Sequence, residues 1–293
     1  MKLFVTGAAG NLGTAVVRKA VARGDQVVAL DVKPTAGPVE GVVGSVTDPG
    51  LVRELAQGCD AIIHTAALHG AHRETHSFAD FIAVNVQGMQ NLLQAAVDGG
   101  VQTVVFSSTA EVVIGRNWDS GGALRYDERA PTNPDWKYPV TKLMAEQLGW
   151  YYAHYHGLRV AALRYMSFGG DDRRVGVGLV ARHLPTDDVA EANLRAVELE
   201  TLCFEVFNIG PDCPLTNEDV VRGLRDPEGV LEKYWPGSVR WLRDAGYPIP
   251  PILWPVADIT KAKQVLGWRP TWGFADLIAE LRAAAGQGEE VMA

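Results

Sequence analysis

Short, almost continuously apolar runs alternate with stretches of helical periodicity along the first 165 residues. Such runs are typical of strands in a parallel sheet that is buried on both faces. The predicted strands are Lys2–Val5, Gln26–Leu30, Val42–Val43, Ala61–Thr65, Val101–Ser107 and Leu158–Leu163. The predicted helices are Asn11–Arg23, Leu51–Gln57, Phe78–Val97 and Tyr138–His156. Because crossovers between parallel strands are right-handed, the alternation predicts an α/β fold with a doubly wound parallel sheet.

The composition changes after about residue 165. Nine of the 16 prolines lie at or beyond Pro211, and five of the 8 tryptophans lie at or beyond Trp235. Short helices are still predicted between the proline-rich segments, at Thr186–Val197, Asn217–Leu224, Asp258–Leu266 and Phe274–Ala285. We therefore expect a sheet domain over residues 1–165 and a smaller lobe over residues 166–293, with more than one crossing between them allowed.

Charge and cysteine content exclude several classes of protein. The chain carries 27 basic and 35 acidic residues, a net charge of −8, which argues against a nucleic-acid partner. Three cysteines do not make a disulfide framework or a common zinc pattern. No apolar run approaches the roughly 18 residues of a membrane-spanning helix, and the N-terminus does not read as a signal peptide. These observations predict a soluble, cytoplasmic protein without a membrane partner.

A glycine-rich turn joins the first predicted strand to its helix. Gly7, Gly10 and Gly13 lie three residues apart, which allows the backbone and the helix N-terminus to approach a pyrophosphate. The spacing differs from the G-x-G-x-x-G fingerprint, and a plain tight turn is the alternative. Asp31 ends the second strand about 20 residues later, where a carboxylate accepts hydrogen bonds from adenosine ribose hydroxyls. The pair predicts NAD as the cofactor, in preference to NADP.

Tyr138 and Lys142 lie four residues apart at the start of a predicted helix, and therefore on one face of it. A nearby ammonium group stabilises the phenolate of a tyrosine, which otherwise titrates near pH 10. An exposed Tyr–Lys pair without function has the same spacing. The preceding strand, however, ends in the hydroxyls of Ser107, Ser108 and Thr109, at the edge where doubly wound folds bind ligands.

Taken together, these motifs resemble those of extended short-chain dehydrogenases/reductases, in the NAD-dependent epimerase/dehydratase family that acts on sugars. The resemblance rests on the glycine turn, Asp31, Asp60–Ala67, Asn85–Gly88, Ser107–Thr109, Tyr138–Lys142, Leu163–Tyr165, Leu184–Val189 and Leu266–Pro270. It covers nearly the whole chain and implies a Rossmann-type fold with a C-terminal substrate-binding lobe. It also implies a homodimer formed through the predicted helices Phe78–Val97 and Tyr138–His156.

The resemblance assigns roles to individual residues. Tyr138 corresponds to the catalytic acid/base, Lys142 to the residue that binds the nicotinamide ribose and tunes the tyrosine, and Thr109 to the group that hydrogen-bonds the reacting hydroxyl. Ser108 is the second candidate for this last role. The implied NAD contacts are Gly7, Ala9, Gly10, Asn11, Leu12, Gly13, Asp31, Thr65, Ala66, Ala67, Asn85, Ser107, Tyr138 and Lys142.

Two departures from the family bear on the reaction. Sugar 4,6-dehydratases of this group carry Asp and Glu after the catalytic threonine, whereas this chain has Ala110 and Glu111, which disfavours dehydration. Glu111 is either a base for a carbon-bound proton or a plain strand-end carboxylate. The segment between Phe168 and Leu184 is short, as in uronate dehydrogenases, which predicts a substrate smaller than a nucleotide sugar. Possible ligands for its carboxylate or phosphate are Arg173, Arg174 and Arg182.

His69, His72 and His76 follow the fourth predicted strand at helical spacing. No cysteine or cluster of carboxylates completes a metal site there, so we expect no metal. A loop over the active site is the preferred interpretation, with His69 as a candidate substrate contact.

The sequence therefore predicts an NAD-dependent enzyme that oxidises a secondary hydroxyl of a sugar or nucleotide sugar to a ketone. Net epimerisation is slightly favoured. The alternative is a dehydrogenase of a small sugar or sugar acid that releases NADH, as uronate dehydrogenases do. A catalytically silent dinucleotide sensor on the same fold is the third possibility.

Overall fold

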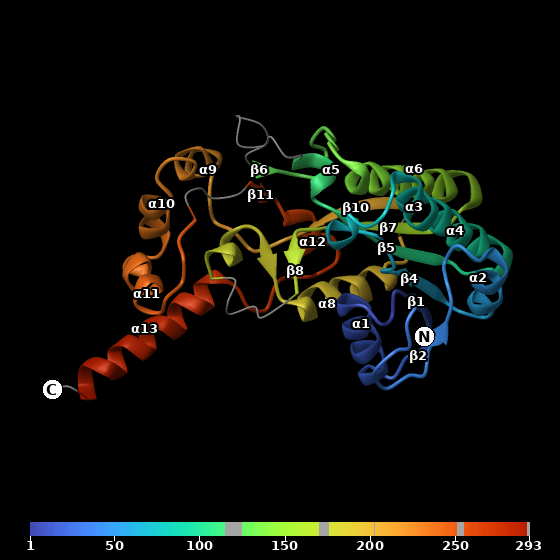
Figure 1. Cartoon of the computed structure of the whole chain (residues 1–293), viewed down its shortest axis with the longest axis horizontal. Coiled ribbons are helices and arrows are strands. Elements are labelled where there is room, and N and C mark those ends of the chain that lie inside the picture. The colour runs from blue at the N-terminus through green and yellow to red at the C-terminus, as the bar shows by residue number, and fades with distance from the viewer. Residues whose placement is uncertain (115–124, 170–175, 202, 251–254, 292–293) are drawn as a thin grey trace.

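A seven-stranded, all-parallel sheet forms the centre of the molecule, in the strand order β3–β2–β1–β4–β5–β7–β10 (Figure 1). The computed structural model describes residues 1–114, 125–169, 176–201, 203–250 and 255–291. The strands are β1 (Lys2–Thr6), β2 (Gln26–Asp31), β3 (Val42–Val43), β4 (Ala61–His64), β5 (Thr103–Thr109), β7 (Arg159–Tyr165) and β10 (Phe204–Ile209). This order confirms the predicted Rossmann-type doubly wound fold.

Helices cover both faces of the sheet (Figure 1). One layer contains α2 (Pro49–Ala56), α3 (Phe78–Ile82), α4 (Gly88–Gly99) and α6 (Lys137–His156). The opposite layer contains α1 (Asn11–Ala22), α8 (Thr186–Val197) and α12 (Thr260–Val265). Side chains alternate along each strand, so Leu3 and Val5 join the core under α1 and α8, while Phe4 joins the core under α2 and α4. Each such side chain contributes about 1.5–3 kcal/mol through its burial.

The chain returns to the sheet after residue 165. Helix α8 packs against α1, and β10 pairs with β7 from Phe204↔Val160 to Ile209↔Tyr165. The sequence analysis places no strand at 204–209, because Glu205 and Asn208 interrupt the apolar pattern there. The structure accommodates both, since Glu205 pairs with Lys261 and Asn208 bonds the carbonyls of neighbouring segments. The domain boundary at residue 165 stays a prediction, with these later elements added to the sheet.

The remaining C-terminal elements pack around a separate apolar core (Figure 1). They include the 3₁₀ turn η4 (Gly176–Val180), α9 (Asn217–Gly223), α10 (Pro227–Tyr234), α11 (Ser238–Asp244) and α13 (Phe274–Val291). Two small parallel sheets lie between this lobe and the main sheet: β6 (Arg125–Tyr126) with β11 (Val256–Ala257), and β8 (Ser167–Phe168) with β9 (His183–Leu184). None of the described helices is long and apolar enough to cross a membrane.

Candidate active site

The predicted glycine turn lies where the strand order reverses, between β1 and β4, which is the usual position of a ligand crevice in this fold. Gly7 has a positive φ of 74°, and a Cβ atom on it would lie 2.5 Å from the amide nitrogen of Ala66. A Cβ atom on Gly13 would lie 2.0 Å from the carbonyl oxygen of Gly7. Both glycines are therefore required, because the backbones of β1, β4 and α1 meet here without space for side chains.

The turn leads into α1 without a capping side chain, since its N-cap residue is Gly10. The first N–H groups of such a helix are available to an anion, which suits a pyrophosphate. Asn11 is exposed at this helix start, and Leu12 is buried beneath it. Asp31 braces the turn from β2: its Oδ2 accepts a hydrogen bond from the amide of Ala9 at 3.0 Å, and its Oδ1 accepts one from the amide of Lys33 at 3.0 Å.

Two buried polar atoms near the crevice have no hydrogen-bond partner among the described residues, Ser107 Oγ on β5 and His64 Nε2 on β4. Buried polar groups are normally satisfied, so unpartnered atoms beside a glycine cradle fit a bound dinucleotide. The other ring nitrogen of His64, Nδ1, lies 2.7 Å from Thr6 Oγ1. Burial, together with the nearby charge of Lys142, lowers the pKa of His64 to about 3, so the ring is neutral at physiological pH.

The segment after β4 is held from below by Asn85. The side-chain amide of Asn85 donates to the carbonyl of Leu68 at 2.9 Å, accepts from the amide of Leu68 at 2.9 Å, and donates to Thr141 Oγ1 at 3.0 Å. Asn85 lies in the π-helical turn η2 (Ala83–Gln87), which interrupts the single helix predicted over 78–97. It connects the loop of Thr65, Ala66 and Ala67 to α6 at the residue preceding Lys142.

Tyr138 and Lys142 occupy the first two turns of α6. Lys142 is only 1% exposed, and its Nζ lies 6.0 Å from the centroid of the Tyr138 ring. Burial lowers the pKa of Lys142 to about 7. Burial raises the pKa of Tyr138 above its ordinary value, and the charge of Glu111 raises it further, while a hydrogen bond with Thr109 acts in the opposite direction. The phenol and the ammonium are thus brought together as their spacing predicts.

The two hydroxyls at the end of β5 have different environments. Ser108 Oγ donates to Glu146 Oε1 at 2.6 Å, and Glu146 in turn forms a buried ion pair with Arg164, with Nη2 to Oε2 at 2.7 Å. Thr109 points to the opposite face, because side chains alternate along a strand, and hydrogen-bonds Tyr138. The geometry therefore favours Thr109 over Ser108 as the group that meets a substrate hydroxyl. Sequence patterns alone did not indicate the Glu146–Arg164 pair.

Glu111 opens the short helix α5 (Glu111–Ile114) directly beyond Thr109. Its amide donates to Thr109 Oγ1 at 3.2 Å, and its Oε2 accepts a hydrogen bond from the indole Nε1 of Trp136 at 2.6 Å. The ring centroid of Trp136 lies 5.6 Å from that of Tyr138. The sequence analysis did not single out Trp136; its place two residues before Tyr138 was the available signal.

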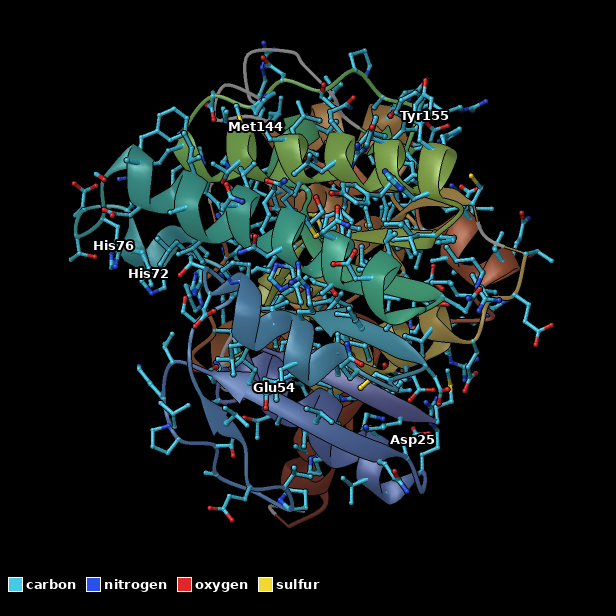
Figure 2. All side chains as sticks on the ribbon, turned by 90° about the vertical axis from the view of Figure 1, so that its right-hand side faces the viewer. Asp25, Glu54, His72, His76, Met144 and Tyr155 are labelled. Carbon is cyan, nitrogen blue, oxygen red and sulfur yellow. The ribbon has the colours of Figure 1, made fainter. Side chains whose placement is uncertain are left out.

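The three histidines gather in the loop between β4 and α3. Ring centroids are 4.9 Å apart for His69–His72 and 5.3 Å apart for His72–His76, and His72 Nδ1 accepts from the amide of His69. Lys137 Nζ ties this loop to the start of α6 by donating to the carbonyls of Arg73 and His76. Burial lowers the pKa of His69, with further contributions from His72 and Lys142. Figure 2 shows His72 and His76 at the outer edge beside α3, and the described residues contain no cluster suited to a metal ion.

Arg182 lines a cavity of about 300 Å³ together with Ser167, Val177, Gly178, His183, Pro248 and Pro250. This cavity begins near the catalytic strand ends: Tyr165 pairs with Thr109, and Ser167, two residues later, pairs with His183 on β9. Arg173 and Arg174, the other two arginines proposed as anion ligands, lie outside the described residues.

Comparison with known proteins adds the following findings. The family model described as the NAD dependent epimerase/dehydratase family matches residues 3–186. UDP-glucose 4-epimerase of Lactobacillus helveticus is 27% identical over 92% of this chain and 92% of its own length. dTDP-glucose 4,6-dehydratase of Streptomyces antibioticus is 31% identical over 95% of this chain and 90% of its own. Uronate dehydrogenase of Pseudomonas putida is 31% identical, over 56% of this chain and 59% of its own.

Among solved structures, MoeE5 in complex with UDP-glucose and NAD superposes with a TM-score of 0.71 at 25% identity. The match covers 97% of this chain and 100% of that chain. It therefore includes the C-terminal lobe as well as the sheet.

Proposed function

The chain belongs to the NAD-dependent epimerase/dehydratase family of sugar-modifying enzymes, and from that premise we propose that it epimerises a sugar or nucleotide sugar at a secondary carbinol. The observation that carries the proposal is the convergence of Tyr138, Lys142 and Thr109 beside the glycine crevice. Oxidation of the carbinol to a ketone, followed by its reduction from the opposite face, inverts one stereocentre. Relatives that perform such chemistry span the whole chain.

Each residue has a defined task in this chemistry. NAD, when bound, supplies the acceptor for the hydrogen that leaves the carbinol carbon. Thr109 hydrogen-bonds the hydroxyl and orients it toward Tyr138, whose phenolate removes the hydroxyl proton and later returns it. Lys142 lies behind the ring and stabilises the phenolate through its positive charge. The residues that would hold the cofactor are those of the glycine turn, Asp31, the Thr65–Ala67 loop and Ser107.

Tyr138 starts from an unfavourable position for a base, because burial and Glu111 both raise its pKa. A shift of about 3 units at neutral pH corresponds to roughly 4 kcal/mol. The ammonium of Lys142 and the positive nicotinamide ring are the charges available to provide it. Oxidation is therefore expected only when the oxidised cofactor is in place, which prevents the site from acting on sugar alone.

Dehydration is the outcome that this chain supports least. Ala110 and Glu111 occupy the positions after the catalytic threonine, so the acid that would protonate a leaving hydroxyl is replaced by a methyl group. Glu111 itself is hydrogen-bonded to Trp136.

A second candidate is a dehydrogenase of a small sugar acid, and the cavity beside Arg182 favours it. Its volume of about 300 Å³ lies at the lower end of ligand pockets and suits a monosaccharide better than a nucleotide sugar. An arginine binds a carboxylate bidentately. In this case the reduced cofactor leaves after a single oxidation.

One assay separates the candidates. The protein is freed of bound cofactor and incubated with NAD and, in turn, UDP-glucose, UDP-galactose, glucuronate and galacturonate. Absorbance at the NADH maximum and product stereochemistry by NMR are recorded together. An inverted product without released NADH supports the epimerase, whereas stoichiometric NADH with an oxidised sugar supports the dehydrogenase. Failure of every sugar to react contradicts both.

We also infer that two copies associate through α3 and α6. Apolar side chains stay exposed on the outer face of α6, where Met144, Tyr151 and Tyr155 share one side of the helix. Phe78 and Ile82 are exposed on the neighbouring α3. Figure 2 looks onto this face, with Met144 toward one end of α6 and Tyr155 toward the other. Exposed apolar groups gathered in one place are typical of interaction sites.

A further inference from the structure

Glu111 is held in place from two sides of the catalytic tyrosine. Its amide donates to Thr109 Oγ1, and its carboxylate accepts the indole N–H of Trp136, the residue whose ring lies 5.6 Å from that of Tyr138. Its charge reaches the phenol, since it raises the pKa of Tyr138. A negatively charged, oriented carboxylate thus lies one residue beyond the groups that hold the reacting hydroxyl.

Two tasks are open to a carboxylate in this position: it removes a proton from the carbon next to the ketone, or it accepts a hydrogen bond from the hydroxyl on that carbon. The hydrogen bond from Trp136 decides between them. A donor to a carboxylate stabilises the ionised form and makes it a weaker base, while leaving lone-pair positions for further donors. Removal of a carbon-bound proton also leads nowhere productive without an acid at position 110, which is alanine.

We propose that Glu111 is a specificity-determining residue whose carboxylate, held by the Trp136 indole, accepts a hydrogen bond from the hydroxyl adjacent to the carbinol that Tyr138 and Thr109 engage. The proposal rests on the proposed function, because it presumes a polyhydroxylated substrate oxidised at this site. Trp136 is the positioning residue of the pair. It is packed against Phe81 and against the guanidinium of Arg73, 5.5 Å from the ring centroid, which holds the indole in one orientation.

The arrangement selects among sugars in two ways. A substrate without the adjacent hydroxyl leaves a carboxylate with an unmet hydrogen bond, which is costly in a partly buried site. A substrate with an anionic group at that carbon is repelled by the like charge. The enzyme therefore favours a vicinal diol at the reacting end of the sugar and tolerates an anion only at a distance, such as beside Arg182.

The test compares sugars with their deoxy analogues. Wild type and Glu111→Ala are each assayed with NAD and UDP-glucose, with D-glucuronate, and with the complete monodeoxy series of both. The readout is the rate at which the nicotinamide is reduced on the enzyme. In the wild type, removal of the hydroxyl adjacent to the reacting carbon should lower kcat/KM by about 10- to 100-fold, the effect of a hydrogen bond to a charged group. In Glu111→Ala, the parent sugar and this analogue should react equally.

Two further variants keep the test decisive if Glu111→Ala folds poorly. Trp136→Phe retains an aromatic ring but lacks the N–H donor, and it should reduce the discrimination against the adjacent-deoxy analogue while leaving NAD affinity unchanged. Glu54→Ala removes an exposed carboxylate on α2 (Figure 2) and should behave as wild type.

Several outcomes overturn the inference. Equal discrimination by wild type and Glu111→Ala would do so while leaving the proposed function intact. Deuterium from solvent entering the adjacent carbon in the wild type, but not in Glu111→Ala, would identify Glu111 as a base instead. A wild-type protein that binds NAD but reduces it with none of these sugars would contradict the inference and the proposed function together.

Discussion

Two opposing charges surround the catalytic phenol. Glu111 lies on the side of the reacting hydroxyl and disfavours the phenolate, while Lys142 lies on the cofactor side and favours it. Lys142 is itself nearly half neutral at physiological pH, because burial lowers its pKa to about 7. The base strength of Tyr138 is therefore a balance of neighbours, and the cofactor's charge adds to one side of it.

Replacement of Tyr138 by phenylalanine tests this assignment most directly. The variant removes only the hydroxyl, so the crevice and its NAD contacts remain. We expect turnover to fall by about 100-fold or more, with NAD affinity measured by calorimetry unchanged. A protein whose biological output survives Tyr138→Phe would be acting as a dinucleotide sensor instead of as a catalyst.

His64 should make the fold sensitive to acid. Its pKa is about 3 in the folded protein and 6.5 in the unfolded chain, so below pH 6.5 the unfolded chain binds a proton that the folded protein does not. The free energy of unfolding therefore falls with decreasing pH between 6.5 and 3, by up to about 1.4 kcal/mol per pH unit. In His64→Gln, this dependence should be weaker.

The measurement is urea unfolding followed by tryptophan fluorescence at pH 7 and pH 4.5. His154→Gln is the matched control, because His154 is exposed on α6. If His64→Gln and the wild type lose the same stability over this range, burial of a neutral His64 is not what limits the fold in acid.

Residues that act through distant partners are the ones that sequence patterns miss. The spacing of Tyr138 and Lys142 is local, so a helix period is enough to predict their shared face. Trp136 and Glu111 are 25 residues apart, and nothing within either segment indicates the hydrogen bond between them. The choice between Ser108 and Thr109 likewise needs the strand register and the position of Glu146.

At the scale of elements, the connection of β2 to the glycine turn is the decisive one. Asp31 ends β2 and holds the amide of Ala9, so one carboxylate both shapes the turn and faces the expected ribose position. We predict that Asp31→Ala weakens NAD binding about 10-fold through lost hydrogen bonds and raises the ratio of NADP to NAD affinity, because repulsion of a 2′-phosphate disappears.

Titration of both dinucleotides against wild type, Asp31→Ala and Asp31→Asn provides the measurement. The asparagine variant removes the charge but retains an oxygen that accepts from one amide, so it separates repulsion from bracing of the turn. An unchanged NADP to NAD ratio in both variants would count against the assigned role of Asp31.

Most of the sheet could be predicted from sequence, and β10 could not. Buried strands such as β4 and β5 are continuous apolar runs, which is the pattern that a doubly covered sheet imposes. β10 lies at the edge of the sheet, where polar residues such as Glu205 are accommodated by partners from other segments. The π-helical turn at 83–87 was equally hidden, because its sequence continues a helical period.

For the molecule as a whole, the exposed face of α6 leads to a prediction about assembly. Tyr155 is 68% exposed and shares its face with Tyr151 and Met144. We expect the double variant Tyr151→Glu/Tyr155→Glu to convert a dimer into a monomer in analytical ultracentrifugation, because buried unpaired carboxylates disrupt an apolar interface.

Val265→Glu offers a matched control, since Val265 is an exposed apolar residue on α12, in the opposite layer. It should leave the sedimentation of the protein unchanged. Monomeric wild-type protein at micromolar concentration, or a double variant that sediments as the wild type does, would contradict association through this face.

The late arrival of β10 also affects how the protein is made. During synthesis, β7 is complete at Tyr165, but its neighbour in the sheet is not finished until Ile209, after the chain has left the sheet and formed β8, β9 and α8. Until then β7 presents a bare edge of unpaired backbone groups, and the sheet face that α8 will cover is open to solvent. A nascent or truncated chain ending near residue 165 is consequently prone to aggregate, and the segment through residue 209 forms the smallest unit in which the cofactor-binding sheet is closed.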